Sequence, residues 1–343
     1  MSAEAMKEIL ALAATGAPLD EARAEEAFEI MMSGEAEDAQ IGGFLMALRV
    51  RGETVAEIAA GARVLRAKAV RIQAPAGAVD TCGTGGDASG TYNISTAAAI
   101  IAAACGVPVA KHGNRAQSSK SGSADILAAL GVDIDADIAR VEDSIRAAGI
   151  GFLMAPRHHS AMRHVGPVRQ ALGTRTIFNL LGPLSNPAGA KRQLLGVFGR
   201  EWLEPMARVL GALGSERAWI VHGSDGLDEL TTTGDSHIAE LRDGAVRCFD
   251  LSPEDAGLGR ADPADLKGGD AATNAAALEA LLGGAPGAYR DIALLNAGAA
   301  LVVADTAPDI AAGVARAAEA VDSGAAKETL ARMVAISEGE SAA

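Results

Sequence analysis

The pattern of apolar residues changes at residues 73–77, and this change constrains the fold more than any other feature of the chain. Over residues 3–72 the apolar side chains recur at three- and four-residue spacing, as in Phe28, Met31 and Met32, which is the spacing of one helix face. Beyond residue 77, short apolar runs alternate with alanine-rich stretches that favour helix. The runs that we expect to form strands are Gly106–Ala110, Trp219–His222 and Ile292–Leu295. This alternation predicts an α/β fold with a central, mostly parallel sheet.

The region before this change also carries signals that start helices. Asp20 is placed to cap the helix that follows it, and Thr54 and Glu57 have the spacing of a capping box. We therefore expect a small helical domain at residues 1–72, joined to a larger α/β domain at residues 78–343.

Composition and charge exclude several classes of protein. Counting glycine and leaving out tyrosine, about 60% of the 343 residues are apolar, above the typical ~45–50%, so a disordered chain is excluded. The formal charge of -14 repels nucleic acid and anionic lipid, and an anionic ligand therefore needs a local basic pocket. The longest apolar run, Ala97–Ala110, is 14 residues long, whereas a membrane-spanning helix needs about 20. We expect neither a nucleic-acid partner nor a membrane partner.

The cysteines bear on the cellular compartment. Cys82, Cys105 and Cys248 are odd in number and far apart, which excludes a disulfide framework and any Cys-x-x-Cys signature. The N-terminal residues form neither a basic region nor an apolar run, so we expect no signal peptide. Both observations predict a cytoplasmic protein.

A glycine-rich segment, Asp80–Asp87, lies between a predicted strand and a helix that begins near Asn93. Glycines let backbone N–H groups approach a ligand, and a helix N-terminus carries partial positive charge, so the segment suits phosphate. A dinucleotide motif is disfavoured because the helix starts too late, and because Lys111 and His112 stand where an acidic residue is needed. A P-loop is disfavoured because no Gly-Lys-Ser/Thr follows the glycines. Taken alone, the segment also fits an ordinary glycine turn.

Two segments of this acidic chain lack acidic residues altogether. Residues 88–124 place three cations and several serines after a predicted strand, as a phosphate site requires, although a solvated basic loop is the alternative. Residues 144–200 contain a cluster of arginines and histidines, and one arginine is a candidate to bind a substrate carboxylate through two parallel hydrogen bonds. The members of this cluster are Arg157, His158, His159, Arg163, His164, Arg169 and Arg175. Spacing does not choose among the arginines, and the histidines lack the spacing of metal ligands.

An acidic pair, Asp228 and Glu229, follows the apolar run at residues 219–222. Carboxylates in such a loop hold Mg²⁺ and leave its other positions to water and phosphate, although a solvated pair at a helix start is the alternative. Cys82 is expected to be a small buried residue at a strand end, and no nucleophile elbow of the Gly-x-Ser-x-Gly type is present.

Taken together, these motifs resemble the anthranilate phosphoribosyltransferase family, almost from end to end of the chain. The matching segments are Asp80–Asp87, Asn93–Thr96, Lys111–Arg115, Ser118–Asp125, Arg175–Pro183, Asp228–Glu229, Gly268–Ala271, Arg290–Ala297 and Asp322–Gly324. Two positions depart from the family pattern: Ser160 replaces an expected proline, and Thr273 stands where a glutamate is usual.

The resemblance implies an activity and an assembly. The phosphoribosyl group of 5-phosphoribosyl diphosphate (PRPP) would pass to the amine of anthranilate, giving N-(5-phosphoribosyl)anthranilate and pyrophosphate, with Mg²⁺ as cofactor. This is the second step of tryptophan biosynthesis from chorismate. The implied fold is a nucleoside phosphorylase/phosphoribosyltransferase-like α/β fold, with a homodimer formed mainly through the helical domain. Neither a covalent nucleophile nor a dedicated catalytic base is expected.

The resemblance also implies the residues of each site. PRPP would be bound by Gly83, Gly86, Asp87, Thr91, Asn93, Ser95, Thr96, Lys111, Asn114, Arg115, Ser118, Ser119 and Ser123. Anthranilate would be bound by Gly83, His112, Asn114, His159 and Arg169. The magnesium contacts would be Ser95, Asp228 and Glu229.

Two alternatives remain within the same fold. A pyrimidine nucleoside phosphorylase-like enzyme is disfavoured because Asp80–Asp87 lacks a Lys-x-Ser-x-Gly-type phosphate motif. A non-catalytic nucleic-acid-binding relative is disfavoured because the chain is acidic and only 3% aromatic.

Overall fold

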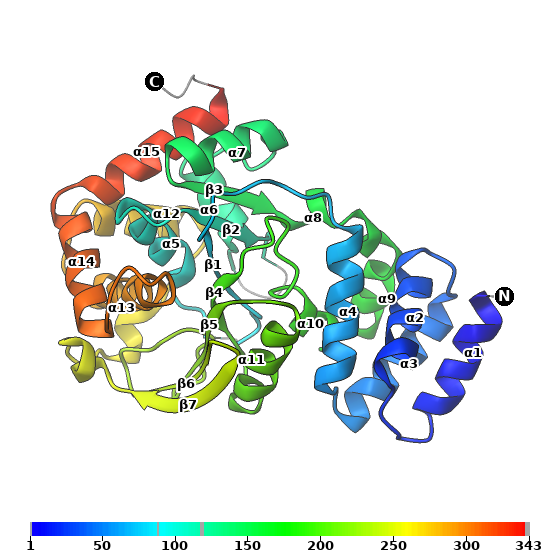
Figure 1. The fold of residues 1–343 in the computed structure, drawn as a ribbon. Helices are drawn as coiled ribbons and strands as arrows, with labels where there is room; N and C mark the ends of the chain where they lie inside the picture. The colour runs from blue at the N-terminus through cyan, green and yellow to red at the C-terminus, as the bar shows by residue number, and fades with distance from the viewer. Residues whose placement is uncertain (1, 88, 117–119, 340–343) are drawn as a thin grey trace.

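The computed structural model describes residues 2–87, 89–116 and 120–339, with a group of helices lying beside an α/β unit (Figure 1). The N-terminal helices are α1 (Ser2–Ala13), α2 (Glu21–Met32), α3 (Asp38–Arg51) and α4 (Val55–Lys68). Both predicted helix starts are confirmed. The side chain of Asp20 accepts a hydrogen bond from the backbone N–H of Arg23 at 2.8 Å, and Thr54 and Glu57 form the capping box.

Within the described residues, one seven-stranded sheet forms the centre of the α/β unit, in the order β3-β2-β1-β4-β5-β6-β7. The strands are β1 (Val79–Gly83), β2 (Val109–Gly113), β3 (Ile150–Met154), β4 (Arg192–Gly196), β5 (Arg217–Gly223), β6 (Ser236–Arg242) and β7 (Ala245–Leu251). Strands β1 to β5 are parallel, which confirms the predicted sheet, whereas β6 and β7 add an antiparallel edge that the sequence analysis missed.

Helices cover both faces of this sheet (Figure 1). The α-helices that pack on the sheet or beside it are α5 (Ile94–Ala104), α6 (Ser123–Ala129), α7 (Ile138–Ala147), α11 (Leu203–Ala212), α12 (Ala271–Leu282), α13 (Ala288–Val303), α14 (Ile310–Asp322) and α15 (Ala325–Glu338). The short 3-10 helices outside the helical group are η2 (Arg200–Trp202), η3 (Pro253–Ala256) and η4 (Pro263–Leu266). In β4, Leu194 packs into the core beneath α5 and α13, while its neighbour Leu195 packs into the core on the opposite face. Because neighbouring residues of the strand are buried on opposite faces of the sheet, the strand is held between two layers of helices.

One predicted strand is wrong, and another is displaced. Residues 292–295 lie in the middle of α13, where every residue from 292 to 303 is buried, so the apolar run shows no helical period. A short apolar run of this kind does not distinguish a strand from a buried helix. The strand predicted at residues 106–110 begins at Val109 instead, whereas the run at residues 219–222 lies in β5 as predicted.

After β3 the chain leaves the sheet and joins the helical group. This excursion contains α8 (Ala155–His158), η1 (Ser160–His164), α9 (Gly166–Leu172) and α10 (Phe178–Leu181). Val168 and Phe178 share one apolar core with Phe28 and Ile58 of α2 and α4. The helical group therefore contains chain from residues 155–181 as well as the N-terminal helices, and the domain limits given above stay a prediction.

The strand order reverses between β1 and β4. The chain builds β2 and β3 on one side of β1 and then crosses to place β4 on the other side. Gly83, the last residue of β1, is paired with Gly196, the last residue of β4. In open α/β sheets the crevice at such a reversal, outside the carboxyl ends of the strands, is where ligands bind. None of the described helices is both long enough and apolar enough to cross a membrane.

Candidate functional site

A cavity of about 820 Å³ opens at the carboxyl ends of β1 and β2, between the sheet and the helical group. Its walls come from four segments that the sequence analysis singled out separately: the glycine-rich loop, the two segments without acidic residues, and the acidic pair. A volume of this size is typical of small-molecule sites. The fold therefore brings the predicted phosphate, carboxylate and magnesium groups to one place.

Glycine is required where the loop that carries Asp228 passes the ends of β1 and β4. A Cβ on Gly196 would lie 1.4 Å from the carbonyl oxygen of Asp228, and a Cβ on Gly83 would lie 2.3 Å from its Oδ2. The backbone N–H of Gly85 donates a hydrogen bond to the same Oδ2 at 2.7 Å. The paired glycines thus allow the Asp228 carboxylate to reach the glycine-rich loop.

Three carboxylates meet beside this loop. Asp87, Asp228 and Glu229 each offer an oxygen, and these oxygens all lie within 4.8 Å of one another. Burial, with the nearby charge of Asp87, raises the pKa of Asp228 to about 6. Burial and the charges of Asp228 and Asp87 also raise the pKa of Glu229 well above its ordinary value. Crowded, poorly solvated carboxylates of this kind fit a hard divalent cation such as Mg²⁺, which would relieve their repulsion. Asp87 is an addition to the predicted magnesium contacts.

A buried cation faces these carboxylates. Lys111 in β2 is 1% exposed, and its Nζ donates hydrogen bonds to the carbonyl oxygen of Thr81 at 2.6 Å and to Oγ of Ser95 at 3.3 Å. Burial lowers the pKa of Lys111, while the charges of Asp80 and Glu229 oppose the shift.

Helix α5 begins at the cavity. The side chain of Asn93 caps α5 by accepting a hydrogen bond from the backbone N–H of Thr96 at 2.9 Å. The start of this helix, with Asn93 and Ser95 in the cavity wall, is the kind of site that binds phosphate. The side chain of Thr96 is fully buried and does not line the cavity, so Thr96 lies beneath the site.

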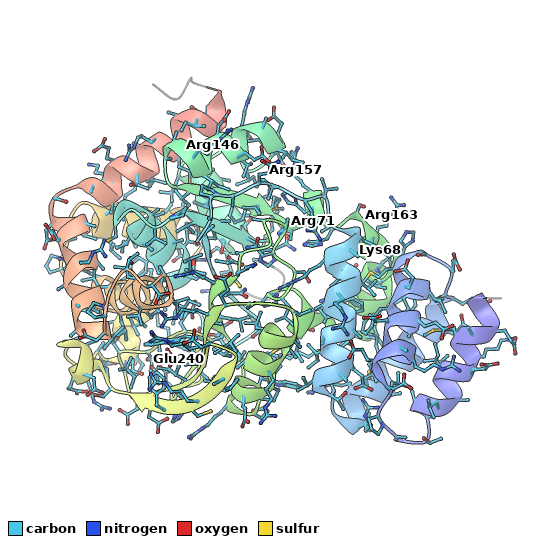
Figure 2. All side chains as sticks on the ribbon, in the orientation of Figure 1. Lys68, Arg71, Arg146, Arg157, Arg163 and Glu240 are labelled. Atoms are coloured by element: carbon cyan, nitrogen blue, oxygen red, sulfur yellow. The ribbon has the colours of Figure 1, made fainter. Side chains whose placement is uncertain are left out.

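Two arginines of the basic segment, Arg163 and Arg169, line the cavity without a carboxylate partner among the described residues, and the more buried of the two is Arg169. Its guanidinium lies 5.3 Å from the ring centre of Phe178, and burial lowers its pKa. None of the described residues donates to or accepts a hydrogen bond from its side chain. By contrast, Arg157 bonds the carbonyl of Asp135, and Figure 2 shows Arg157 near the outer surface. Arg163 is exposed and donates from Nε to Nε2 of His164, so the geometry favours Arg169 for the carboxylate, the residue that the family resemblance also implies.

Arg175 contacts the glycine-rich loop. Its guanidinium donates a hydrogen bond to the carbonyl oxygen of Gly86 and lies 4.1 Å from the ring centre of Phe198. It therefore anchors the glycine-rich loop, a role that the sequence analysis did not assign.

Two histidine side chains lie close together in the cavity wall. The rings of His112 and His159 lie 6.5 Å apart, and both residues line the cavity. In the part of the chain that the structure describes, neither ring nitrogen of His159 has a hydrogen-bond partner. Burial, with the nearby charges of His112 and His158, lowers the pKa of His159 to about 4, so this ring is neutral near pH 7.

Most of the predicted site residues line this one cavity. They are Gly83, Gly86, Asp87, Thr91, Asn93, Ser95, Lys111, His112, Asn114, Arg115, Ser123, His159, Arg169, Asp228 and Glu229. Arg115 also pairs with Asp125 at 3.1 Å. The predicted contacts Ser118 and Ser119 lie outside the described residues. The sequence analysis assigned no role to the lining residues Met162, Phe178, Asn179 and Pro183, although the last three lie in a quoted motif.

Comparison with known proteins decides the family. Two protein-family models match the chain. The family model described as "Glycosyl transferase family, helical bundle domain" matches residues 7–69, and the one described as "Glycosyl transferase family, a/b domain" matches residues 75–327. The anthranilate phosphoribosyltransferase of Rhodospirillum rubrum is 68% identical over 335 residues, which cover 98% of this chain and 96% of that protein. The chain belongs to the anthranilate phosphoribosyltransferase family. The family member from Azospirillum brasilense is 65% identical over 331 residues, covering 96% of this chain and 93% of that protein.

Solved structures of the family share the fold. The crystal structure of the Thermus thermophilus enzyme has a TM-score of 0.91 at 46% identity, covering 98% of this chain and 99% of that one. The Saccharomyces cerevisiae enzyme in complex with PRPP and Mg has a TM-score of 0.85 at 28% identity, covering 93% of this chain and 94% of that one. The family makes the chain a pentosyltransferase, and it favours neither the phosphorylase nor the nucleic-acid-binding alternative.

Proposed function

We propose that the cavity is the place where this enzyme transfers the phosphoribosyl group of PRPP to the amine of anthranilate. The observation that carries the proposal is the juxtaposition in one cavity of two separate anion sites. One combines the start of α5 with the buried Lys111 and suits a diphosphate, whereas the other is the unpaired guanidinium of Arg169 and suits a carboxylate. A phosphorylated sugar and an aromatic acid can therefore be held side by side.

PRPP is assigned to the glycine-rich loop and the start of α5. Backbone N–H groups of the loop, the Asn93 and Ser95 side chains, and Lys111 supply donors for phosphate oxygens. Arg175 holds the loop in place through the carbonyl of Gly86. Because these groups are fixed before substrate arrives, they stabilise charge on the departing pyrophosphate without reorganising.

The carboxylates of Asp228 and Glu229 would hold Mg²⁺, with the Ser95 hydroxyl and Asp87 nearby. When bound, the ion supplies positive charge to the pyrophosphate oxygens as the bond to the sugar breaks. The raised pKa values of Asp228 and Glu229 support this assignment, because a cation would favour the ionised carboxylates that burial disfavours.

Anthranilate is assigned to the side of the cavity formed by the helical group. Two parallel hydrogen bonds from Arg169 would hold its carboxylate, and His112, Asn114 and His159 would flank its ring and amine. Rate then comes mainly from holding the amine against the anomeric carbon, since an aniline-type amine needs little deprotonation before it attacks. Ser160, which departs from the family pattern, lies in the wall next to His159.

We also propose that two copies associate through the helical group and act in the cytoplasm. Leu12 at the end of α1 is 40% exposed and Val50 near the end of α3 is 82% exposed, and these two helices contact each other. These two exposed side chains are compatible with an interface on the helical group, and the dimer is otherwise carried by the family resemblance. The free cysteines Cys82, Cys105 and Cys248 support a reducing compartment.

The test of the activity uses the native fluorescence of anthranilate. Mixing the enzyme with anthranilate, PRPP and MgCl₂ is expected to remove the fluorescence at a rate proportional to enzyme concentration. Reactions lacking PRPP or containing excess EDTA serve as controls and are expected to stay fluorescent. Persistent fluorescence in the complete mixture would contradict the proposal.

A further inference from the structure

A buried carboxylate lies behind the cavity wall and touches no part of the cavity. Asp80 in β1 is 0% exposed and does not line the site. Its Oδ1 accepts a hydrogen bond from the backbone N–H of His112 at 3.2 Å, and its Oδ2 lies 3.3 Å from Nδ1 of the same histidine. Gln193, its cross-strand neighbour in β4, donates from Nε2 to Oδ2 at 3.4 Å. The Asp80 carboxylate thus contacts His112 from β2 and Gln193 from β4.

Asp80 is ionised in this environment. Burial alone raises the pKa of Asp80, but hydrogen bonds and charge from His112, together with Asn186 and Lys111, lower it below its ordinary value. An ionised carboxylate only accepts hydrogen bonds, so the contact at Oδ2 requires a proton on Nδ1 of His112. The other ring nitrogen, Nε2, makes no hydrogen bond to any residue that the structure describes, and the ring lines the cavity.

We propose that Asp80 is a positioning residue, which holds His112 with Nδ1 protonated so that Nε2 receives the proton released by the substrate amine. The proposal rests on the proposed function, which places anthranilate against His112. The amine nitrogen forms a bond to the anomeric carbon, and the bond from that carbon to pyrophosphate breaks with its electron pair on the pyrophosphate oxygen. One N–H proton then passes to Nε2, which leaves a neutral secondary amine and an imidazolium facing Asp80.

This inference goes beyond the sequence analysis, which expected no dedicated base. An aniline-type amine needs none before attack, but after attack its nitrogen is cationic and must lose a proton. The neighbouring His159 is poorly suited to take the proton, since its pKa is lowered to about 4 and its ring has no hydrogen-bonded carboxylate among the described residues. Of the two histidines, His112 alone has a carboxylate behind it.

The same cluster could be taken for a metal site, because ligand atoms of Asp80, Cys82 and His112 lie within 4.8 Å of one another. The Gln193 amide contradicts that alternative. Its Nε2, which carries two protons, lies 2.6 Å from the carbonyl oxygen of Pro183 and 3.1 Å from Sγ of Cys82, in addition to its contact with Asp80. Burial also raises the pKa of the Cys82 thiol well above its ordinary value, so no thiolate is offered. The cluster is a hydrogen-bonded network.

The kinetic test is Asp80→Asn. Asparagine keeps an oxygen for the backbone N–H of His112 but offers an N–H to Nδ1, which reverses the proton arrangement of the ring. We expect kcat to fall by about tenfold to a hundredfold, because a correctly placed acid–base group contributes about a hundredfold or more. The KM for PRPP should stay within about twofold of the parent value.

Two further variants test whether Asp80 acts through His112 or only through the stability of the fold. In a His112→Ala background, Asp80→Asn is expected to change kcat by less than about twofold, because it acts through the missing ring. Glu57→Gln is the matched control, since Glu57 is equally buried and hydrogen-bonded but lies in the helical group away from the cavity. It should lower stability and leave kcat unchanged. A loss of kcat from Asp80→Asn that is equal in both backgrounds, or no loss at all, overturns the proposal.

A second measurement is independent of activity. Long-range ¹H–¹⁵N spectra of the ¹⁵N-histidine-labelled enzyme, with His112 assigned from its absence in His112→Ala, report which ring nitrogen carries the proton. A protonated Nδ1 and an unprotonated Nε2 support the proposal, whereas the reverse arrangement, or a stoichiometric metal ion at this cluster, overturns it. If the spectra agree but anthranilate is never consumed, the proposed function has failed and the placement of His112 has not.

Discussion

Replacing Asp228 by asparagine should stabilise the metal-free enzyme, although it removes a proposed magnesium ligand. Burial and the charge of Asp87 raise the pKa of Asp228 to about 6 in the folded chain, whereas an aspartate in an unfolded chain has a pKa of about 3.9. The folded state therefore binds more protons than the unfolded state between these values. It follows that stability falls as the pH rises from about 4 to about 6, and stays lower above that window.

The size of the effect follows from the same shift. A difference of about two pKa units corresponds to about 3 kcal/mol, and the asparagine oxygen can still accept the Gly85 N–H, so most of this free energy should be recovered. For a chain of 343 residues, about 2–3 kcal/mol amounts to a rise of about 3–4 °C in Tm. At pH 4 the gain should vanish, because the parent carboxyl is largely protonated in the folded state.

Differential scanning calorimetry in EDTA, at pH 8 and at pH 4, measures this gain. Asp80→Asn is the matched comparison, because the pKa of Asp80 is lowered and its loss should destabilise the enzyme at pH 8. Adding MgCl₂ and PRPP should stabilise the parent more than Asp228→Asn. A variant that is no more stable than the parent at pH 8, or equally stabilised at both pH values, would refute the electrostatic argument.

Three other variants, one of them a double substitution, test the remaining parts of the site. Arg169→Ala should raise the KM for anthranilate by about tenfold to a hundredfold with little change in kcat, because a charge-assisted pair contributes about 1.5–3 kcal/mol; a comparable rise for PRPP would contradict this assignment. Arg175→Ala should raise the KM for PRPP in steady-state kinetics by freeing the carbonyl of Gly86, and an unchanged value would exclude the anchoring role. Asp228→Asn combined with Glu229→Gln should lower turnover and weaken its dependence on Mg²⁺, and an unaltered magnesium titration would count against both ligands.

Local sequence patterns predicted the elements whose causes are local. The cap at Asp20 and the capping box of Thr54 and Glu57 depend on residues three apart, and both are present. The glycine-rich loop and its following helix were recognised because their chemistry lies in one continuous segment. In contrast, residues 292–295 form helix because α13 is surrounded by apolar neighbours, and that burial is not encoded in the run itself.

Features that depend on distant partners could not be predicted. Spacing alone did not separate Arg169 from the other arginines, and only the family resemblance named it. In the fold, Arg157 and Arg175 bond backbone carbonyls and Arg163 bonds His164, which leaves the Arg169 guanidinium without a hydrogen-bond partner among the described residues. The Asp80 network was missed for the same reason, since Gln193 follows Asp80 by more than a hundred residues and meets it only through strand pairing. Lysine, arginine and carboxylate counts pointed to the candidate site but did not divide it between two substrates; the resemblance implied that division, which stays a proposal.

The excursion of residues 155–181 into the helical group has a mechanical consequence. The chain crosses between the two bodies of the molecule at three places, after α4, after β3 and before β4. Any displacement of the helical group relative to the sheet must therefore bend all three crossings together, and it must also deform the apolar core that Phe28 and Ile58 share with Leu195 of β4. Arg169 would move with the helical group while Lys111 stays with the sheet, so such a displacement would change the distance between the proposed anthranilate and diphosphate sites.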